Sequence, residues 1–142
     1  MHDPVDRIVA AFQTLTPASV DSLGDIYTPD ARFRDPFSDV QGLPQIQHIF
    51  RHMFETLEDP RFIVTQRIVQ GTQCFLTWEF RFGFQRFKQG QGQCILGGSH
   101  LVLNDEGRIT IHRDYWDAAE ELYEKLPVVG ALMRWLKRQA KP

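Results

Sequence analysis

The sequence predicts an α+β fold in which helices come first and an antiparallel sheet follows. Apolar residues recur at helical spacing from Asp3 to Leu57, interrupted by one short alternating segment. From Pro60 to about Asp117 they recur at every second residue, as in strands. Because helices and strands do not alternate, a doubly wound parallel sheet is excluded. The helices are expected to fold onto one face of a curved sheet.

Three helices are expected before the sheet. Asp3 and Pro4 form a cap and first-turn pair for the first. Its apolar stripe consists of Val5, Ile8, Val9, Phe12 and Leu15. Thr16-Pro17 predicts a short second helix that carries Val20, Leu23 and Tyr27 and is blocked by Pro29. Pro44 opens a third, whose wide stripe must pack on another element. That stripe consists of Ile46, Ile49, Phe50, Met53, Phe54 and Leu57.

The strands are bounded by prolines and by glycine-containing turns. Residues 31–35 alternate and stop at Pro36, as an edge strand would. Four long strands follow, with breaks at Gln70-Gly71, in the Gly90/Gly92 loop and at 104–107. The chain is therefore expected to form one domain over residues 1–142, in which 118–142 is a C-terminal helical extension.

Composition narrows the class of protein. With 142 residues, 42% of them hydrophobic, the chain is long enough for one core without a disulfide or metal. Cys74 and Cys94 lack ligand spacing and are expected to be free thiols. Sixteen basic and eighteen acidic residues are dispersed at a net charge of -2, which argues against nucleic-acid binding. An acidic N-terminus and the lack of a long apolar run predict a cytoplasmic location.

Three segments carry a resemblance to a known superfamily. They are Tyr27-Thr-Pro-Asp-Ala-Arg-Phe-Arg-Asp-Pro36, Gly42 leading into a helix, and Asn104-Asp-Glu-Gly-Arg-Ile-Thr-Ile-His-Arg-Asp-Tyr-Trp-Asp117. In this order they resemble the NTF2-like superfamily, which includes ketosteroid isomerase, limonene-epoxide hydrolase and the SnoaL polyketide cyclases. The resemblance implies a cone-shaped fold. Its strongly curved antiparallel sheet would carry the three N-terminal helices on its concave face and enclose a small-molecule pocket.

Asp35 is the first candidate catalytic residue. It shares a strand face with Phe33, and apolar surroundings would raise its pKa toward that of a general base. Its position resembles that of the proton-shuttling aspartate of ketosteroid isomerase. The oxyanion residues of that enzyme fall at Ala11 or Phe12 and at Ser99, so the same reaction is not expected. Alternatively, Asp35 simply makes a turn with a backbone N–H.

Asp114 is the second candidate. It matches the first aspartate of the Arg-Asp-Tyr-Phe-Asp run that serves limonene-epoxide hydrolase as an acid/base. A four-residue turn between 103 and 108 would set Ser99 opposite His112 and Gly97 opposite Asp114, all on one face. Ser99 and His112 are therefore expected to supply hydrogen bonds there, and Trp116 to contact substrate.

Glu79 and Arg81 also lie two apart, so they share one face of a strand. With Asp114 they would hold a water or an oxyanion; the alternative is a salt bridge on a solvated face. The other face of that strand is strongly apolar: Cys74, Leu76, Trp78, Phe80, Phe82 and Phe84. If it faces outward, a homodimer is expected to cover it. If it lines the cone, Glu79 and Arg81 lie at the surface or in an interface.

Metal binding is not expected. His48 and His52 lie at i,i+4 but off the apolar stripe, and His100 and His112 are predicted on opposite faces. The basic, amphipathic C-terminal helix is expected to dock on protein rather than on a membrane.

Together these patterns predict a small-molecule pocket protein without a cofactor. It would be an isomerase, cyclase or hydrolase using Asp35 and Asp114 on a small apolar carbonyl or epoxide compound. The alternative is a non-catalytic ligand-binding or dimeric assembly module of the same fold.

Overall fold

The computed structural model describes residues 3–84 and 92–116; the predicted C-terminal helix lies outside the described residues. In chain order the elements are α1 (Pro4–Gln13), the 3-10 helix η1 (Ser19–Asp25), β1 (Tyr27–Arg34), β2 (Asp39–Gln41), α2 (Leu43–Thr56), β3 (Leu57–Gln70), β4 (Gln73–Phe84), β5 (Gln93–Leu103) and β6 (Ile109–Trp116).

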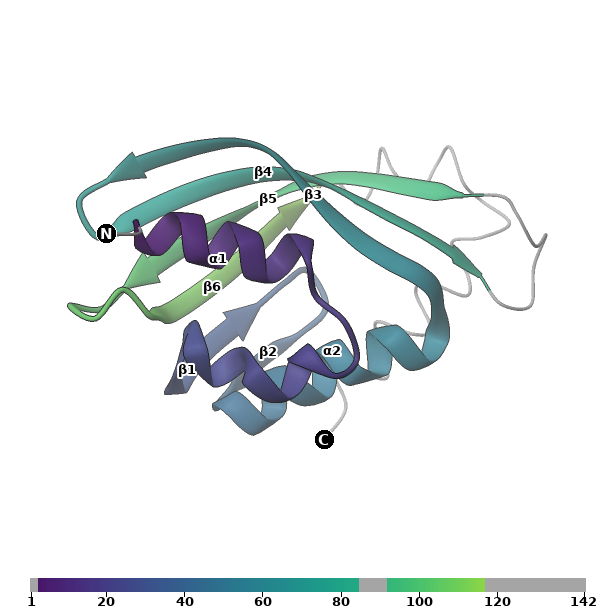
Figure 1. Cartoon of the computed structure of the whole chain (residues 1–142), viewed down its shortest axis with the longest axis horizontal. Helices are drawn as coiled ribbons and strands as arrows, with labels where there is room; N and C mark the ends of the chain where they lie inside the picture. Colours follow the sequence, from purple (N-terminus) through teal and green to yellow (C-terminus); the bar gives the residue numbers. More distant parts are fainter. Residues whose placement is uncertain (1–2, 85–91, 117–142) are drawn as a thin grey trace.

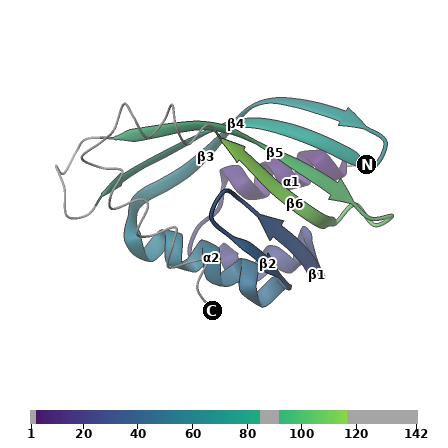
Figure 2. The same ribbon diagram turned by 180° about the vertical axis from the view of Figure 1, so that it is seen from behind.

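One six-stranded sheet in the order β2-β1-β6-β5-β4-β3 forms the body of the molecule. The strands β3 to β6 are the four long strands expected from the alternating pattern, and they pair as an antiparallel meander. Figure 1 shows the sheet curving over α1 and α2, and in Figure 2 α1 is seen behind β5 and β6 while α2 lies below the long strands. The predicted α+β class is therefore confirmed.

The helix starts follow local sequence signals. Asp3 caps α1 by accepting a 2.9 Å hydrogen bond from the Val5 N–H, and Pro4 occupies the first turn. Pro44 likewise stands in the first turn of α2, after Gly42 with a φ of 105°. In the described residues, no helix is long and apolar enough to cross a membrane.

The second helix differs from its prediction. It is a 3-10 helix that ends at Asp25, and Tyr27 and Pro29 belong to β1. The Ile109 N–H donates to the Ile26 carbonyl oxygen at 2.7 Å, where the parallel pairing of β1 with β6 begins. Tertiary pairing therefore overrides the local helical pattern.

β1 was predicted as an edge strand, and this was wrong. The three-residue strand β2 pairs with it on one side and β6 on the other, so β2 forms the edge. The β1–β6 pair is parallel, so the sheet is not wholly antiparallel as expected.

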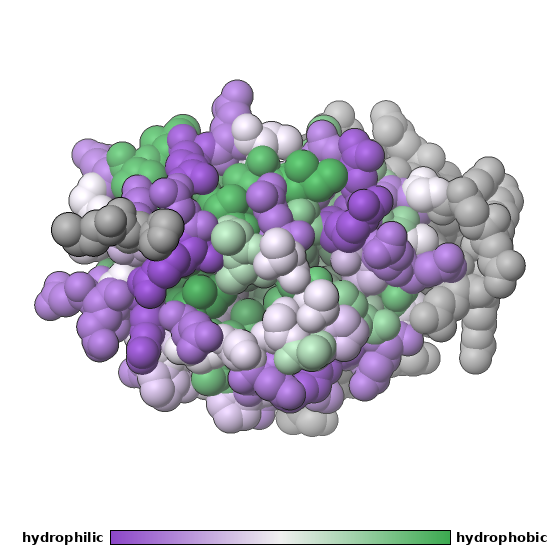
Figure 3. Space-filling view, viewed as in Figure 1, coloured by the Kyte–Doolittle hydropathy of each residue, from purple (hydrophilic) through white to green (hydrophobic). Residues whose placement is uncertain are grey.

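The apolar face of β4 points toward the helices. Its buried side chains belong to one core cluster with the stripes of α1 and α2: Cys74, Leu76, Trp78, Phe80 and Phe82. On the side of the molecule that carries α1, hydrophobic residues are interspersed with hydrophilic ones (Figure 3). The aromatic row of β4 is thus core, which decides the question that the sequence left open.

The predicted register of β5 and β6 is shifted by two residues. Ser99 pairs with Asp114, and Leu101 with His112: Leu103 pairs with Ile109 instead of residue 108, and the register slips by one more residue between Val102 and Leu103. A shift of two leaves every side chain on its expected face, because faces alternate with period two.

Candidate functional site

A cavity of about 90 Å³ lies between the inner face of the sheet and the two α-helices. Four polar side chains line it at one region of a mostly apolar wall: Asp35, Ser99, His112 and Asp114. Aromatic rings make up much of the remainder: Phe12, Phe33, Phe50, Phe62, Trp78, Phe80 and Trp116. An apolar hollow with a few convergent polar groups is the usual form of a ligand site.

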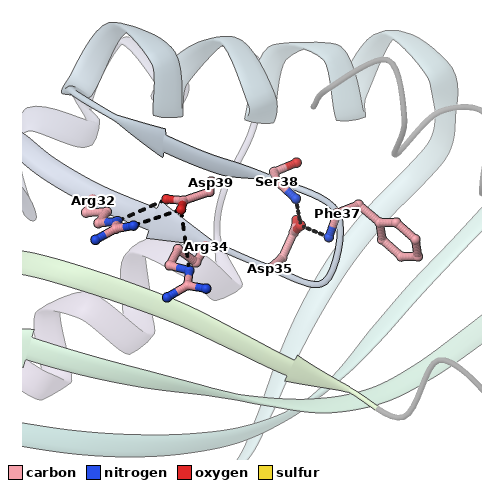
Figure 4. Close-up of polar contacts among 6 residues, drawn as sticks. All are labelled: Arg32, Arg34, Asp35, Phe37, Ser38 and Asp39. Atoms are coloured by element: carbon pink, nitrogen blue, oxygen red, sulfur yellow. Dashed lines mark hydrogen bonds and ion pairs between the residues drawn. The ribbon is translucent and has the colours of Figure 1, made fainter. Parts of the chain in front are cut away.

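The turn between β1 and β2 positions Asp35. Its Oδ1 accepts hydrogen bonds from the backbone N–H groups of Phe37 at 2.8 Å and Ser38 at 2.6 Å (Figure 4). The Asp35 N–H in turn donates to the Ser38 carbonyl oxygen at 2.9 Å. Asp35 therefore makes the turn that was predicted as the alternative to a catalytic role. It also lines the cavity.

Burial changes the acidity of Asp35. Desolvation, together with the nearby negative charge of Asp114, raises the pKa of this carboxyl from 3.8 to about 6. The backbone N–H groups of Phe37 and Ser38 act in the opposite direction because they stabilise the ionised form. A carboxyl with a pKa near 6 exchanges protons readily close to neutral pH.

Two side chains contact the same oxygen of Asp114. Its Oδ1 accepts from Ser99 Oγ at 2.5 Å and lies at hydrogen-bond distance, 2.6 Å, from His112 Nε2. Ser99 Oγ itself accepts from the indole N–H of Trp78 at 2.9 Å. The side chain of Asp114 is 17% exposed and so remains within reach of the cavity.

His112 is almost fully buried and uses both ring nitrogens. Nδ1 lies 2.6 Å from the hydroxyl of Tyr27, and Nε2 bonds Asp114. The rings of Phe12 and Phe33 pack edge-on against the imidazole. Ser99 and His112 therefore both contact Asp114; that they also bond substrate stays a prediction.

Two further residues of this network were missed from the sequence. Tyr27 is fully buried, and only the parallel pairing of β1 with β6 brings it to His112. Trp78 was expected only as an apolar wall. A Cβ on Gly97 would lie 2.5 Å from the Trp78 ring, so this glycine leaves the room that the indole occupies. The adjacent pair Gly97-Gly98 in β5 was the available sequence signal.

Glu79 and Arg81 do not join the site. They form an ion pair with each other at 2.7 Å, and their side chains are 28% and 53% exposed. Trp78 pairs with Gly97 on the inner face, so the alternation of β4 turns Glu79 outward. The predicted trio with Asp114 is therefore wrong, and the solvated salt bridge is what the structure contains.

The expected reason for a homodimer also changes, because the aromatic row of β4 is not on the outer face. Other large apolar side chains are exposed there, namely Ile63, Ile68, Leu96, Ile111 and Tyr115. The homodimer stays a prediction.

A second, more open hollow of about 660 Å³ shares Asp35, Asp114 and Trp116 with the cavity. It also touches Leu96 and Arg113 on strands β5 and β6. The carboxyl groups therefore stand between the apolar interior and a hollow that opens to solvent.

The described residues contain no group of three or more side chains suited to holding a metal ion. Among them, neither Cys74 nor Cys94 forms a disulfide.

Comparison with solved structures gives similar folds at low sequence identity. A ketosteroid isomerase-like protein from Catenulispora acidiphila, in complex with trimethylamine, is 17% identical with a TM-score of 0.70, over 85% of this chain and 90% of that one. An epoxide hydrolase of the limonene-epoxide hydrolase type from M. tuberculosis is 17% identical with a TM-score of 0.69, over 92% of both chains. A putative SnoaL-like polyketide cyclase from Jannaschia sp. CCS1 is 18% identical with a TM-score of 0.68, over 98% of this chain and 93% of that one.

No curated protein matches the sequence. The family model for the SnoaL-like domain matches residues 5–112, a range that holds α1 from its second residue, η1, α2, strands β1 to β5 and the start of β6. The chain therefore belongs to the SnoaL-like domain family.

Proposed function

We propose that this protein is a cofactor-independent enzyme that moves protons on a small, largely apolar carbonyl or epoxide compound. One observation carries the proposal: Asp35 and Asp114 line the same apolar cavity, where burial raises the pKa of Asp35 while Asp114 contacts Ser99 and His112 through one oxygen. Two titratable groups that face one cavity from different environments are typical of acid–base sites.

The two carboxyls divide the roles of acid and base. Asp114 accepts two short hydrogen bonds, which stabilise its negative charge. Asp35, whose pKa is raised to about 6 by burial, holds a proton more readily. In the productive state the two carboxyls hold one proton between them: Asp35 carries it and Asp114 is ionised.

This state serves either substrate. With a carbonyl compound, Asp35 protonates the carbonyl oxygen while Asp114 removes a proton from the neighbouring carbon, which yields an enol. With an epoxide, Asp35 protonates the ring oxygen while Asp114 takes a proton from the water that attacks the carbon. Both donors on Asp114 reach Oδ1 in the described part of the chain, so Oδ2 is its working oxygen.

Two generic reactions test the proposal. The protein is incubated with cyclohexanone in D₂O, and exchange of the α-hydrogens is followed by NMR; hydrolysis of cyclohexene oxide is followed in parallel. Asp35→Asn and Asp114→Asn are each expected to lower an observed rate by about 10²-fold or more. Asp30→Asn, on the exposed part of β1, is the matched control. Equal rates in wild type and both variants would refute the proposal.

A non-catalytic ligand-binding module is the second candidate, because each carboxyl already has a structural partner. Trp78 and Trp116 line the cavity, so quenching of their fluorescence reports binding. Quenching by cyclohexanone without exchange or hydrolysis above background would favour this candidate.

A further inference from the structure

We propose that Tyr27, which does not line the cavity, is a positioning residue that sets the tautomer of His112 and thereby fixes Asp114. The hydrogen-bonded chain runs from the Tyr27 hydroxyl to Nδ1 of His112, and from Nε2 of His112 to Oδ1 of Asp114, at 2.6 Å for each bond. The inference rests on the proposed function for its catalytic meaning, but the proton positions can be measured without a substrate.

The donor and acceptor in each bond follow from the groups present. An ionised carboxylate only accepts, so Nε2 of His112 must carry the proton that bonds Asp114. In a neutral imidazole the other nitrogen is then an acceptor, so the Tyr27 hydroxyl must donate to Nδ1. Burial, together with the charge of Asp114, raises the pKa of Tyr27 well above its ordinary value, so the phenol keeps its proton.

A charged imidazolium would break this arrangement. Nδ1 would then donate to Tyr27, and the phenolic proton would need another acceptor. Tyr27 is fully buried, and its bond to His112 is the only one its hydroxyl makes within the described residues. A buried donor without an acceptor is unfavourable, so Tyr27 favours the neutral ring.

Packing fixes the geometry as well as the proton. The rings of Tyr27 and His112 are nearly parallel, with an interplanar angle of 6° and centroids 5.9 Å apart. The rings of Phe12 and Phe33 make T-shaped contacts with the imidazole, at centroid distances of 5.7 and 4.7 Å. His112 therefore acts as a fixed donor to Asp114, and its Nδ1 is not free to take a proton from substrate.

The closing experiment reads these protons by NMR on full-length protein labelled with ¹⁵N-histidine. The chain has five histidines, and the His112 signals are assigned by their loss in His112→Gln. In wild type, Nε2 is expected to be protonated and Nδ1 unprotonated, with a downfield phenolic proton correlated to Nδ1. In Tyr27→Phe, that proton is lost and His112 is expected to show a second tautomer or an added proton at Nδ1.

A wild-type ring protonated at Nδ1 would overturn the inference, as would an unchanged His112 spectrum in Tyr27→Phe. If Tyr27→Phe does not fold, the wild-type spectrum alone decides. Where the protein catalyses exchange or hydrolysis, Tyr27→Phe should lower kcat several-fold and leave KM near wild type, because Tyr27 does not touch the ligand. If Asp35→Asn loses activity but the wild-type spectrum shows His112 protonated at Nδ1, the proposed function stands and only this inference is overturned.

Discussion

Replacing Asp35 with asparagine measures the free-energy cost of holding an ionised carboxyl beside the apolar cavity. The asparagine side-chain oxygen still accepts the N–H bonds of Phe37 and Ser38, so the turn is kept while the charge is removed. The pKa of Asp35 is raised from 3.8 to about 6 in the folded protein, chiefly by burial. The folded state therefore binds the proton more tightly than the unfolded chain does.

The sign and size follow by linkage. A raised carboxyl pKa gives wild type stability that is fully present below pH 3.8 and is lost as the pH rises through about 6. A difference of about 2 pH units corresponds to about 3 kcal/mol at pH 8. Integrating down to pH 5 leaves about 1.6 kcal/mol, so the advantage of Asp35→Asn should shrink by about 1.4 kcal/mol between pH 8 and 5.

Urea unfolding of both proteins at pH 8, 7, 6 and 5, followed by tryptophan fluorescence, gives the free energies of unfolding. Asp30→Asn, an exposed position on the same strand, serves as the control and should show no comparable trend. If the free energies of unfolding of wild type and Asp35→Asn differ by the same amount at every pH, burial does not raise the pKa of Asp35.

Three further outcomes are expected. Asp114→Asn should lower the pKa of Asp35 from about 6, because the charge of Asp114 is one of its causes, and ¹³C NMR of the Asp35 carboxyl measures this. Gly97→Ala should destabilise the fold by about 1–3 kcal/mol in urea unfolding and displace Trp78, because the new Cβ would lie 2.5 Å from that ring. Leu96→Arg, at a side chain 58% exposed on the outer face, should convert a homodimer to monomer in light scattering.

Each substitution has a matched control. Asp105→Asn, in the exposed turn before β6, should leave the Asp35 titration unchanged. Gly92→Ala adds a Cβ with nothing within 4 Å and should be neutral, unlike the change at Gly97. Ala10→Arg, exposed on α1, adds the same charge away from the outer face. A monomeric wild type, or a dimer that survives the change at Leu96, would contradict the outer-face interface.

Local signals in the sequence correctly predicted the elements whose limits depend on neighbouring residues in the chain. The cap at Asp3, the proline at the start of α2 and the alternation of the four long strands all act within a few residues of where they appear. The short second helix was predicted, but its end and the start of β1 were placed wrongly, because Tyr27 pairs in the sheet with a strand more than 80 residues away. Local patterns carry no information about such a partner.

The orientation of the sheet was the second feature of the fold that the sequence could not predict. Alternation assigns Trp78 and Glu79 to opposite faces of β4, but it does not say which face is covered. Coverage comes from the helix stripes, which pack on the aromatic side and leave the Glu79–Arg81 ion pair outside.

The meeting of Asp35 and Asp114 depends on a strand pair that the sequence did not predict. β1 and β6 are parallel, and their pairing ends with Arg34 beside Arg113. Parallel strands bring residues at their carboxyl-terminal ends to the same edge, so the next residue of each strand is an aspartate facing the same cavity. In an antiparallel pair, the end of β1 would lie beside the start of β6 near Ile109, and the two carboxyls would be separated by the length of the strand. The direction of β1 relative to β6 is therefore what turns two isolated aspartates into one candidate site.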